Sequence, residues 1–341
     1  MGECGRCLSS MQPQEGRYDA RGSGNAFIKK PTPTILDRSF GRGSPGISEF
    51  LAPLYFEQSR MSPAARVILS DRAISREKLN HGGTGSFIVN NQLFWRIDQP
   101  ESKHLNLAYD EIRSGKSAGI IPAQVIPPTA IFFDMDATVI EEESLVEIAR
   151  LAGKQAEVEA LTDVAMSGQM DFSESLRARL KILVGLRKSE LTNIKPTLCP
   201  GMQYLSDWCH KKGIRIFLIT GGFREFANPV AQKLGFTDFK SNRFAWDGDL
   251  MQGEVEGAII DANGKKQAVF DWCVSLGIDP LHTVAVGDGA NDRLMLKSCG
   301  MAVGFRPKRV LWPHLDFANH TGDHGFLLAA LCHDGDNNSG A

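Results

Sequence analysis

The most constraining feature of this 341-residue chain is an alternation of short apolar segments with helical patterns that starts at Thr129. Four segments have the length and apolar character of buried strands: 130–133, 214–220, 283–286 and 301–304. Parallel strands need long crossover connections, which helices usually supply. We therefore predict that residues 126–332 form an α/β fold, in which a parallel sheet carries helices on both faces.

The first two predicted strands are about 80 residues apart, far more than a simple crossover requires. Most of the intervening chain has helical periodicity, at 143–152, 155–166, 172–183 and 188–194. An insertion after the first strand would lie over the carboxyl ends of the strands, where open α/β sheets bind ligands. We predict an inserted helical cap over residues 143–198.

The N-terminal third has a different character, with many Gly, Pro and Ser residues and little sustained periodicity. We expect disorder in residues 1–50. Residues 51–125 are either a small accessory domain or a partly ordered extension, and the sequence leaves both open. Within them we predict a hairpin, 87–89 with 93–97, and a helix over 105–113.

Composition excludes several classes of partner. The formal net charge of −2 gives no reason to expect nucleic acid or a membrane surface. No apolar run approaches the ~20 residues that span a bilayer. The seven cysteines are scattered and no signal peptide precedes them, so we expect a reduced, cytoplasmic protein. We also expect a disordered tail, 333–341, and surface or helix-capping positions for His320 and His324.

Two carboxylates, Asp134 and Asp136, directly follow the first predicted strand. Carboxylates at a buried strand end are costly unless something neutralises them. A divalent cation does so, and Mg²⁺ prefers carboxylate and carbonyl oxygens. Taken alone, a D-x-D pair can also be a solvated loop.

Polar groups follow two further strands. Thr220 begins a Thr-Gly-Gly turn, which can present backbone N–H groups to an anion. Asp288, Asn291 and Asp292 follow the strand 283–286. Helix capping by Asn291 or Asp292 would account for one of these residues but not for Asp288. Since the carboxyl ends of parallel strands share one edge of a sheet, we expect the three groups to converge.

This combination resembles the haloacid dehalogenase (HAD) superfamily, whose members mostly transfer phosphoryl groups. The superfamily pattern is D-x-D-x-T/V, a strand-end Ser or Thr, a Lys, and then G-D-x-x-N-D. The chain carries these elements in order: Asp134, Asp136 and Thr138, then Thr220, then Lys265, then GDGAND at 287–292. The resemblance implies a HAD-like Rossmannoid sheet with a cap.

The resemblance is closer still to the phosphoserine phosphatase family. It rests on FDMDATVI (133–140), AMSGQMDFSESLRARL (165–180), TGGF (220–223), residues 261–265 and AVGDGAND (285–292). It covers about residues 129–330 and leaves out the N-terminal third. It implies hydrolysis of O-phospho-L-serine, the last step of serine biosynthesis in this family.

The resemblance assigns the chemistry to the aspartates. Asp134 would be the nucleophile that takes the phosphoryl group. Asp136 would protonate the leaving oxygen and later activate water. The Mg²⁺ ligands would be the carboxylates of Asp134 and Asp288 and the backbone carbonyl of Asp136, with Asp292 supporting the metal's water shell.

The resemblance also assigns the substrate contacts. Thr220 and Lys265 would bind phosphate oxygens, although Lys266 is adjacent and could take the place of Lys265. Gly221 and Asn291 would help to place the substrate. The remaining contacts lie in the cap: Glu143 for the ammonium, Arg179 for the carboxylate, and the apolar Met166 and Phe172.

Helical periodicity bears on Arg179 independently. In a helix that starts after Asp171, an apolar stripe forms from Phe172, Leu176, Leu180 and Leu183. Arg179 lies at the edge of this stripe, whereas Arg177 faces solvent. An arginine in such a place favours a carboxylate or phosphate partner, although it could instead extend to water or pair with a glutamate of the cap.

Several alternatives remain open from the sequence. Ala137 stands where the family most often has Ser, at a position used mainly through its backbone. Another small ester, such as phosphohomoserine or phosphothreonine, could be the substrate. An inactive regulatory or binding protein on the same fold is a further reading. We expect a small phosphorylated amino acid as the partner, and a homodimer is an option for assembly.

Overall fold

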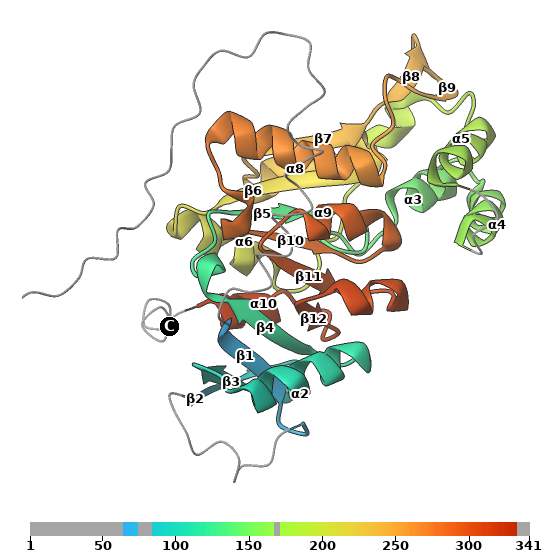
Figure 1. Ribbon diagram of the computed structural model, residues 1–341. Helices are drawn as coiled ribbons and strands as arrows, with labels where there is room; N and C mark the ends of the chain where they lie inside the picture. The colour runs from blue at the N-terminus through green and yellow to red at the C-terminus, as the bar shows by residue number, and fades with distance from the viewer. Residues whose placement is uncertain (1–63, 74–83, 167–170, 333–341) are drawn as a thin grey trace, which may run out of the picture. The chain divides into compact units, whose positions relative to one another are not determined.

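The computed structural model describes residues 64–73, 84–166 and 171–332. Its central feature is a parallel sheet built from the predicted apolar segments (Figure 1). The strands are β5 (Ala130–Phe133), β6 (Arg215–Phe223), β10 (Thr283–Gly287) and β11 (Met301–Phe305). Short strands β7 (Asp238–Asn242) and β12 (Phe317–Asn319) flank them, giving the order β12-β11-β10-β5-β6-β7. The predicted parallel α/β sheet is confirmed.

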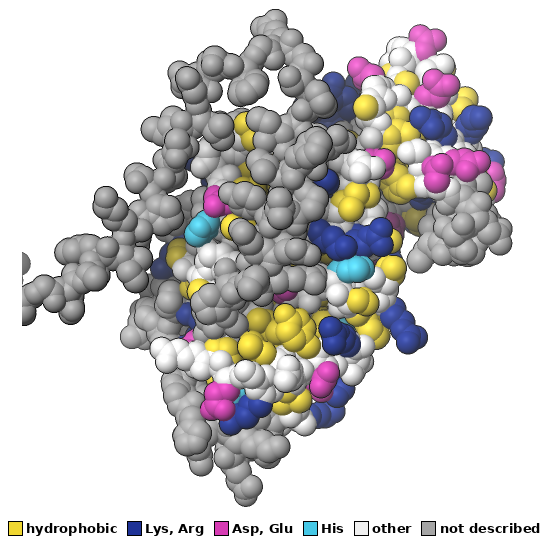
Figure 2. Space-filling model, viewed as in Figure 1, with side chains coloured by type: hydrophobic (Ala, Val, Ile, Leu, Met, Phe, Trp, Pro, Cys, Tyr) yellow, Lys and Arg dark blue, Asp and Glu magenta, His cyan; other side chains and the backbone are white. Residues whose placement is uncertain are grey.

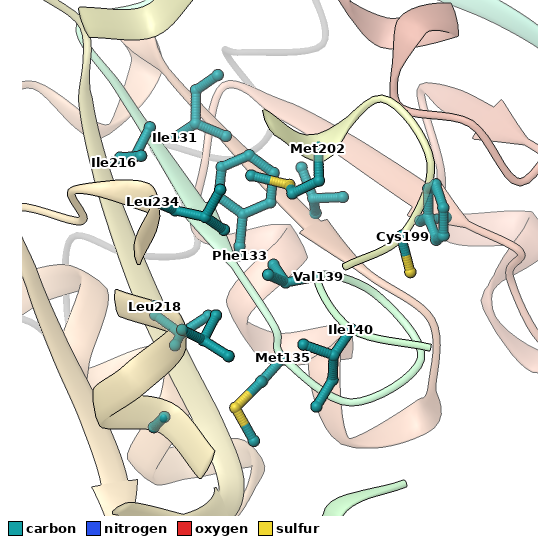
Figure 3. Packing of buried hydrophobic residues seen from close by; sticks show 14 of the residues in the cluster. Ile131, Phe133, Met135, Val139, Ile140, Cys199, Met202, Ile216, Leu218 and Leu234 are labelled. Atoms are coloured by element: carbon teal, nitrogen blue, oxygen red, sulfur yellow. The ribbon is translucent and has the colours of Figure 1, made fainter. Parts of the chain in front are cut away.

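Side chains on these strands alternate between two cores, as the period of a strand requires. Ile131 and Phe133 of β5 enter one core, whereas Ala130 and Phe132 enter the other. Figure 3 shows the first core, where Ile131 and Phe133 lie near Leu234 and Met202. Both faces of the sheet are therefore covered.

Helices from later in the chain supply the covering layers. The first core receives α6 (Met202–Lys211), α7 (Arg224–Leu234) and α10 (Gly325–Leu331). The second core receives α8 (Ala262–Leu276) and α9 (Arg293–Lys297). Short 3₁₀ segments complete the connections: η2 (Ala123–Val125), η4 (Pro280–His282), η5 (Ala290–Asp292) and η6 (Arg309–His314).

The described part of the N-terminal region extends the same sheet. It comprises β1 (Ala64–Ser70), β2 (Thr84–Val89), β3 (Gln92–Asp98), α2 (Ser102–Arg113) and β4 (Ala118–Pro122). The hairpin β2–β3 and the helix α2 confirm the two elements predicted there. β4 pairs antiparallel with β12, and the sheet reaches ten strands in the order β2-β3-β1-β4-β12 and onward. Gly119 permits this pairing, because a Cβ there would lie 2.0 Å from the ring of Phe317.

The cap follows β5 as predicted. It contains α3 (Ser144–Leu151), α4 (Gln155–Met166), α5 (Phe172–Ile182) and the 3₁₀ segment η3 (Lys188–Asn193). A separate hairpin, β8 (Phe244–Asp247) with β9 (Leu250–Val255), lies beside α5 (Figure 1). On the face shown in Figure 2, acidic and basic side chains are interspersed over the cap, in keeping with the small net charge.

Further predictions concerned His324, the cysteines, membrane-spanning helices and the two termini. His324 precedes α10 at its N-cap, but it is fully buried, so a surface position is wrong for this residue. The five cysteines among the described residues are buried free thiols. Within the described ranges, no helix is long and apolar enough to cross a membrane. The disorder expected for 1–50 and 333–341 concerns residues outside those described.

Candidate active site

The loop after β5 carries Asp134 and Asp136. The N–H of Asp134 donates to the carbonyl of Val286 in β10 at 2.9 Å, which ties the start of the loop to the sheet. The following turn closes on the carbonyl of Met135, which accepts three backbone N–H groups. Ala137 in this turn has φ of 52°, a left-handed conformation that costs a non-glycine residue about 1 kcal/mol. Both aspartates line one pocket of about 90 Å³.

Lys265 of α8 lies beneath the first aspartate. Its Nζ is fully buried and donates to Asp134 Oδ1 and to Asp292 Oδ1, each at 2.6 Å. Burial alone would lower the pKa of Lys265, but these two carboxylates raise it, so the ammonium stays charged. Lys266 is partly exposed and its Nζ lies 5.8 Å from the centre of the Phe270 ring. The lysine at this site is therefore Lys265.

The loop after β10 supplies two further carboxylates. Asp292 Oδ2 accepts the backbone N–H groups of Asp288 and Gly289 at 3.1 and 3.0 Å. Asp288 Oδ2 pairs with Lys308 Nζ at 2.9 Å. Asp292 thus holds the loop in shape, while Asp288 reaches the pocket.

The donor set of this site fits a divalent metal ion. Three carboxylate oxygens, one from each of Asp134, Asp288 and Asp292, lie within 4.8 Å of one another. Burial, followed by the charge of Asp292, raises the pKa of Asp134 well above its ordinary value and that of Asp288 to about 6. A hard divalent cation relieves such crowding, because carboxylate oxygens are its preferred ligands.

The end of β6 faces the same pocket. Thr220 Oγ1 accepts the N–H of Gly222 at 2.7 Å, which shapes the turn. Asn242 braces it from β7, donating to the carbonyl of Gly221 and accepting a backbone N–H from the segment before α8, each at 2.8 Å. Thr220 and Gly221 line the pocket together with Asn291.

The cap closes the pocket from the other side. Glu143 and Arg179 line it together with Phe172, whose ring is so near that a Cβ on Gly221 would lie 2.8 Å from it. Arg177, two residues from Arg179, is exposed. The direction predicted from helical periodicity is therefore confirmed for both arginines. Arg179 Nε donates to a backbone carbonyl of its own helix at 3.3 Å.

Asp136 titrates in an unusual range for a carboxyl group. Burial, followed by the charge of Glu143, raises the pKa of Asp136 to about 7. A hydrogen bond from Ser144 Oγ to Asp136 Oδ2, 2.8 Å long, acts in the opposite direction. A carboxyl group with this pKa can donate or accept a proton near neutral pH.

Sequence reasoning missed three residues at or beside the site, and one residue that it predicted has a side chain that the structure does not describe. Lys308 follows the end of β11, so its place after a fourth strand was an available signal. Ser144 and Asn242 carry no motif, and only the folded chain brings Ser144 to the pocket and Asn242 to the turn at Gly221. Met166 ends α4, and its side chain lies outside what the structure describes.

Comparison with known proteins agrees with this geometry. The profile of the haloacid dehalogenase-like hydrolases matches residues 131–297. A phosphoserine phosphatase from Albidiferax ferrireducens is 37% identical over 186 residues, covering 52% of this chain and 78% of that protein. The chain belongs to the phosphoserine phosphatase family of the HAD superfamily. A solved phospho-aspartyl intermediate analogue of phosphoserine phosphatase matches with a TM-score of 0.55 and 32% identity, over 59% of this chain and 98% of that one.

A second solved structure extends the likeness beyond the catalytic domain. A HAD family hydrolase from Salmonella enterica serovar Typhi aligns with a TM-score of 0.67 and 25% identity. The alignment covers 79% of the present phosphatase family member and 98% of the Salmonella protein. Residues 126–332 make up about three fifths of the chain, so a match of that extent includes part of the N-terminal region.

Proposed function

We propose that this protein hydrolyses O-phospho-L-serine to serine and phosphate through an aspartyl phosphate on Asp134. One observation carries the proposal. Glu143 and Arg179, an acidic and a basic side chain, line the same pocket as Asp134 and Asp136. A pocket with this charge pattern at its cap end suits a zwitterionic amino acid whose phosphate faces the aspartates.

Asp134 acts as the nucleophile. Lys265 holds its Oδ1 at 2.6 Å, which fixes the carboxylate and partly offsets the burial and the Asp292 charge that raise its pKa. The other oxygen is then available to attack phosphorus. A carboxylate nucleophile divides one difficult displacement into two easier steps. Lys265 also offsets charge that gathers on the phosphoryl oxygens.

Asp136 moves the protons. With a pKa of about 7, it can protonate the seryl oxygen as the P–O bond breaks. The resulting carboxylate then takes a proton from the water that attacks the aspartyl phosphate. One residue thus serves as acid in the first step and as base in the second.

The cation in this proposal is Mg²⁺. Asp134, Asp288 and the backbone carbonyl of Asp136 would hold it, and Asp292 would orient its water ligands. When bound, Mg²⁺ neutralises phosphate charge and orients the phosphoryl group. Loss of activity in EDTA and its return with MgCl₂ is the expected behaviour, and activity that is indifferent to chelation would contradict this assignment.

The substrate contacts follow from the lining of the pocket. Thr220, Gly221 and Asn291 bind the phosphate end. Arg179 pairs with the substrate carboxylate in a bidentate geometry that its planar guanidinium favours. Glu143 pairs with the ammonium. Since the cap restricts the pocket to about 90 Å³, a small ester fits this site better than a phosphorylated protein segment.

The decisive experiment compares two arginines of one helix. Arg179→Ala should raise KM for phosphoserine at least about tenfold, because a buried charge-assisted pair contributes roughly 1.5–3 kcal/mol. It should change KM for p-nitrophenyl phosphate, which has no carboxylate, much less. Arg177→Ala is the matched control, since Arg177 is exposed, and it should behave as wild type.

Phosphothreonine and phosphohomoserine belong in the same assay, because Glu143 and Arg179 recognise the amino-acid backbone and not the side chain. A kcat/KM preference for either would overturn phosphoserine as the substrate. Absence of turnover with every ester would favour an inactive binding protein. Two finer proposals, a homodimer and a cytoplasmic location, are tested by sedimentation velocity and by cell fractionation.

A further inference from the structure

Asn242 lies opposite an irregularity in the sheet. It is the last residue of β7, the edge strand beside β6, and only 2% of it is exposed. The two strands pair regularly up to Ile219, but the next four residues of β6 are opposed by only two of β7, so that Phe223 pairs with Asn242. The turn at 220–222, which lines the pocket, is therefore a bulge in β6. A bulge leaves backbone groups without partners in the neighbouring strand.

The side-chain amide of Asn242 supplies partners at this bulge. Its Nδ2 donates to the carbonyl of Gly221, and its Oδ1 accepts the N–H of Ile260, each at 2.8 Å. Because one neighbour is an acceptor and the other a donor, both ends of the amide are used and its orientation is fixed. An aspartate of the same shape would offer acceptors only. The position therefore requires an amide.

The contact with Ile260 reaches the start of the helix that carries the buried lysine. Ile260 directly precedes Asp261, the N-cap of α8, whose Oδ1 accepts the N–H of Gly264 at 2.8 Å. Lys265 is the next residue of this first helical turn. One side-chain amide thus joins the turn at 220–222 to the helix end that places Lys265.

Two further contacts connect β7 to α8 at residues that do not line the pocket. Asp238 Oδ2 accepts the indole N–H of Trp272 at 3.0 Å, and Lys240 Nζ pairs with Asp271 Oδ2 at 2.7 Å. Asp238, Lys240 and Asn242 alternate along the strand and therefore share the face toward α8. β7 thus fastens α8 to the sheet, and Asn242 is the contact of this row that reaches the pocket turn.

We propose that Asn242 is a positioning residue for phosphate binding, which fixes the spacing between the turn at 220–222 and Lys265 so that both meet the same phosphoryl group. The inference rests on the proposed function and deepens it. Asn242 does not line the pocket, so it acts through Gly221 and through α8. A misplacement of about 1 Å in such a site can lower the rate about 100-fold.

Asn242→Asp is the informative variant. It keeps the shape and the acceptor for Ile260, but it loses the donor and sets a carboxylate against the Gly221 carbonyl. Inorganic phosphate is the probe, because it fills only the phosphate end of the pocket and needs no turnover. In an equilibrium titration with MgCl₂ present, we expect the Kd for phosphate to rise at least about tenfold.

Kinetics give a second readout. Asn242→Asp should lower kcat/KM about 10- to 100-fold for phosphoserine and for p-nitrophenyl phosphate alike, because both carry the same phosphoryl group. Arg179→Ala, by contrast, should affect mainly phosphoserine. A loss shared by both esters therefore places the effect of Asn242 at the phosphate end of the pocket.

Two controls separate positioning from a general loss of stability. Lys240→Gln removes a contact between the same strand and α8. Ser206→Ala removes a fully buried hydroxyl of α6, which donates to the carbonyl of Leu234 at 2.6 Å. Both should keep the phosphate Kd and both kinetic values within about twofold, while thermal melts measure folding. If Asn242→Asp does not fold, Asn242→Ala removes both hydrogen bonds without adding charge and should weaken phosphate binding in the same direction.

Unchanged phosphate affinity in a folded Asn242 variant, or an equal loss in Ser206→Ala, would overturn the role of Asn242. If the wild-type protein binds phosphate but hydrolyses neither ester, the proposed function fails, and the phosphate titration still decides the role of Asn242. The two failures are therefore distinguishable.

Discussion

At the residue scale, the site concentrates charge in a buried place. Asp134, Asp292 and Lys265 are all less than 5% exposed, and Asp288 is 6% exposed. Buried ion pairs of this kind contribute little net stability, but breaking one leaves an uncompensated charge. Their value lies in geometry, since Lys265 connects the nucleophile to the loop after β10. The same low exposure also strengthens any electrostatic effect on a bound phosphate.

His324 provides a pH-dependent prediction. Its Nε2 lies 2.8 Å from the carbonyl of Thr138, and its ring stacks on Phe305 with centres 4.1 Å apart. Burial lowers the pKa of His324 to about 4. The unfolded chain therefore takes up a proton first, so stability that is present above about pH 6.5 should be lost as the pH falls toward 4. The loss should be about 2–3 kcal/mol.

Urea unfolding at pH 7 and pH 4.5 measures this loss. His324→Phe keeps a stacked ring without a titrating group, and its free energy of unfolding should fall less over this interval than that of the wild type. His210→Gln, at an exposed position, should fall by the wild-type amount. Identical losses for wild type and His324→Phe would refute the assignment.

Sequence reasoning found the residues of the site that belong to motifs and missed those that the fold brings in. Asp134 and Asp288 follow strand ends and Thr220 lies near the end of β6, so a parallel sheet had to bring them to one edge. Ser144 reaches the pocket only because α3 begins there. The burial of His324 depends on packing between distant segments, which local patterns do not encode.

At the element scale, the cap depends on a hairpin from another part of the chain. β9 lies against α5, the helix that carries Arg179. Gly253 of β9 has φ of +72°, and a Cβ there would lie 2.5 Å from Val184 Cγ2 and 3.0 Å from the carbonyl of Leu180. The hairpin therefore supports α5, and through it Arg179, the proposed ligand of the substrate carboxylate.

Gly253→Ala should separate the hairpin from α5. We expect thermal stability to fall, and KM for phosphoserine to rise through displacement of Arg179. Gly248→Ala is the matched control: its φ of +57° brings a similar backbone cost of about 1 kcal/mol, but nothing lies within 4 Å of its Cβ. Equal kinetic effects of the two variants would show that backbone strain alone is responsible.

The helices and the central strands were predictable, because each has its own periodicity. The joining of β4 to β12 was not. This pair connects residues nearly 200 positions apart in the sequence, and strand order depends on such long-range pairing. The sequence therefore left open how residues 51–125 are organised, although it indicated their hairpin and helix.

At the scale of the whole molecule, the N-terminal strands and the last helix stabilise each other. Arg66 of β1 is 5% exposed, and its Nη1 donates to the carbonyls of Ala330, Leu331 and Cys332 at 3.0, 3.2 and 2.9 Å. These carbonyls lie at the end of α10, where a cation also interacts favourably with the helix dipole. Phe94 of β3 packs on Phe326 of α10 with ring centres 4.5 Å apart.

Arg66→Met should therefore destabilise the whole described sheet. We expect a loss of about 2–4 kcal/mol, because buried carbonyls lose a charged donor. Arg72→Met, at an exposed position in the same segment, should change the free energy of unfolding by less than about 0.5 kcal/mol. Denaturant unfolding followed by tryptophan fluorescence measures both, and equal stabilities would contradict this role of Arg66.

The pairing of β4 with β12 also has a consequence for biosynthesis. A ribosome delivers β4 nearly 200 residues before its partner strand β12, and α10 follows β12. Until then, the apolar surface around Phe94 lacks its cover, and exposed strand edges of this kind favour aggregation. Nascent chains of this protein should therefore depend on chaperones until β12 and α10 have been synthesised.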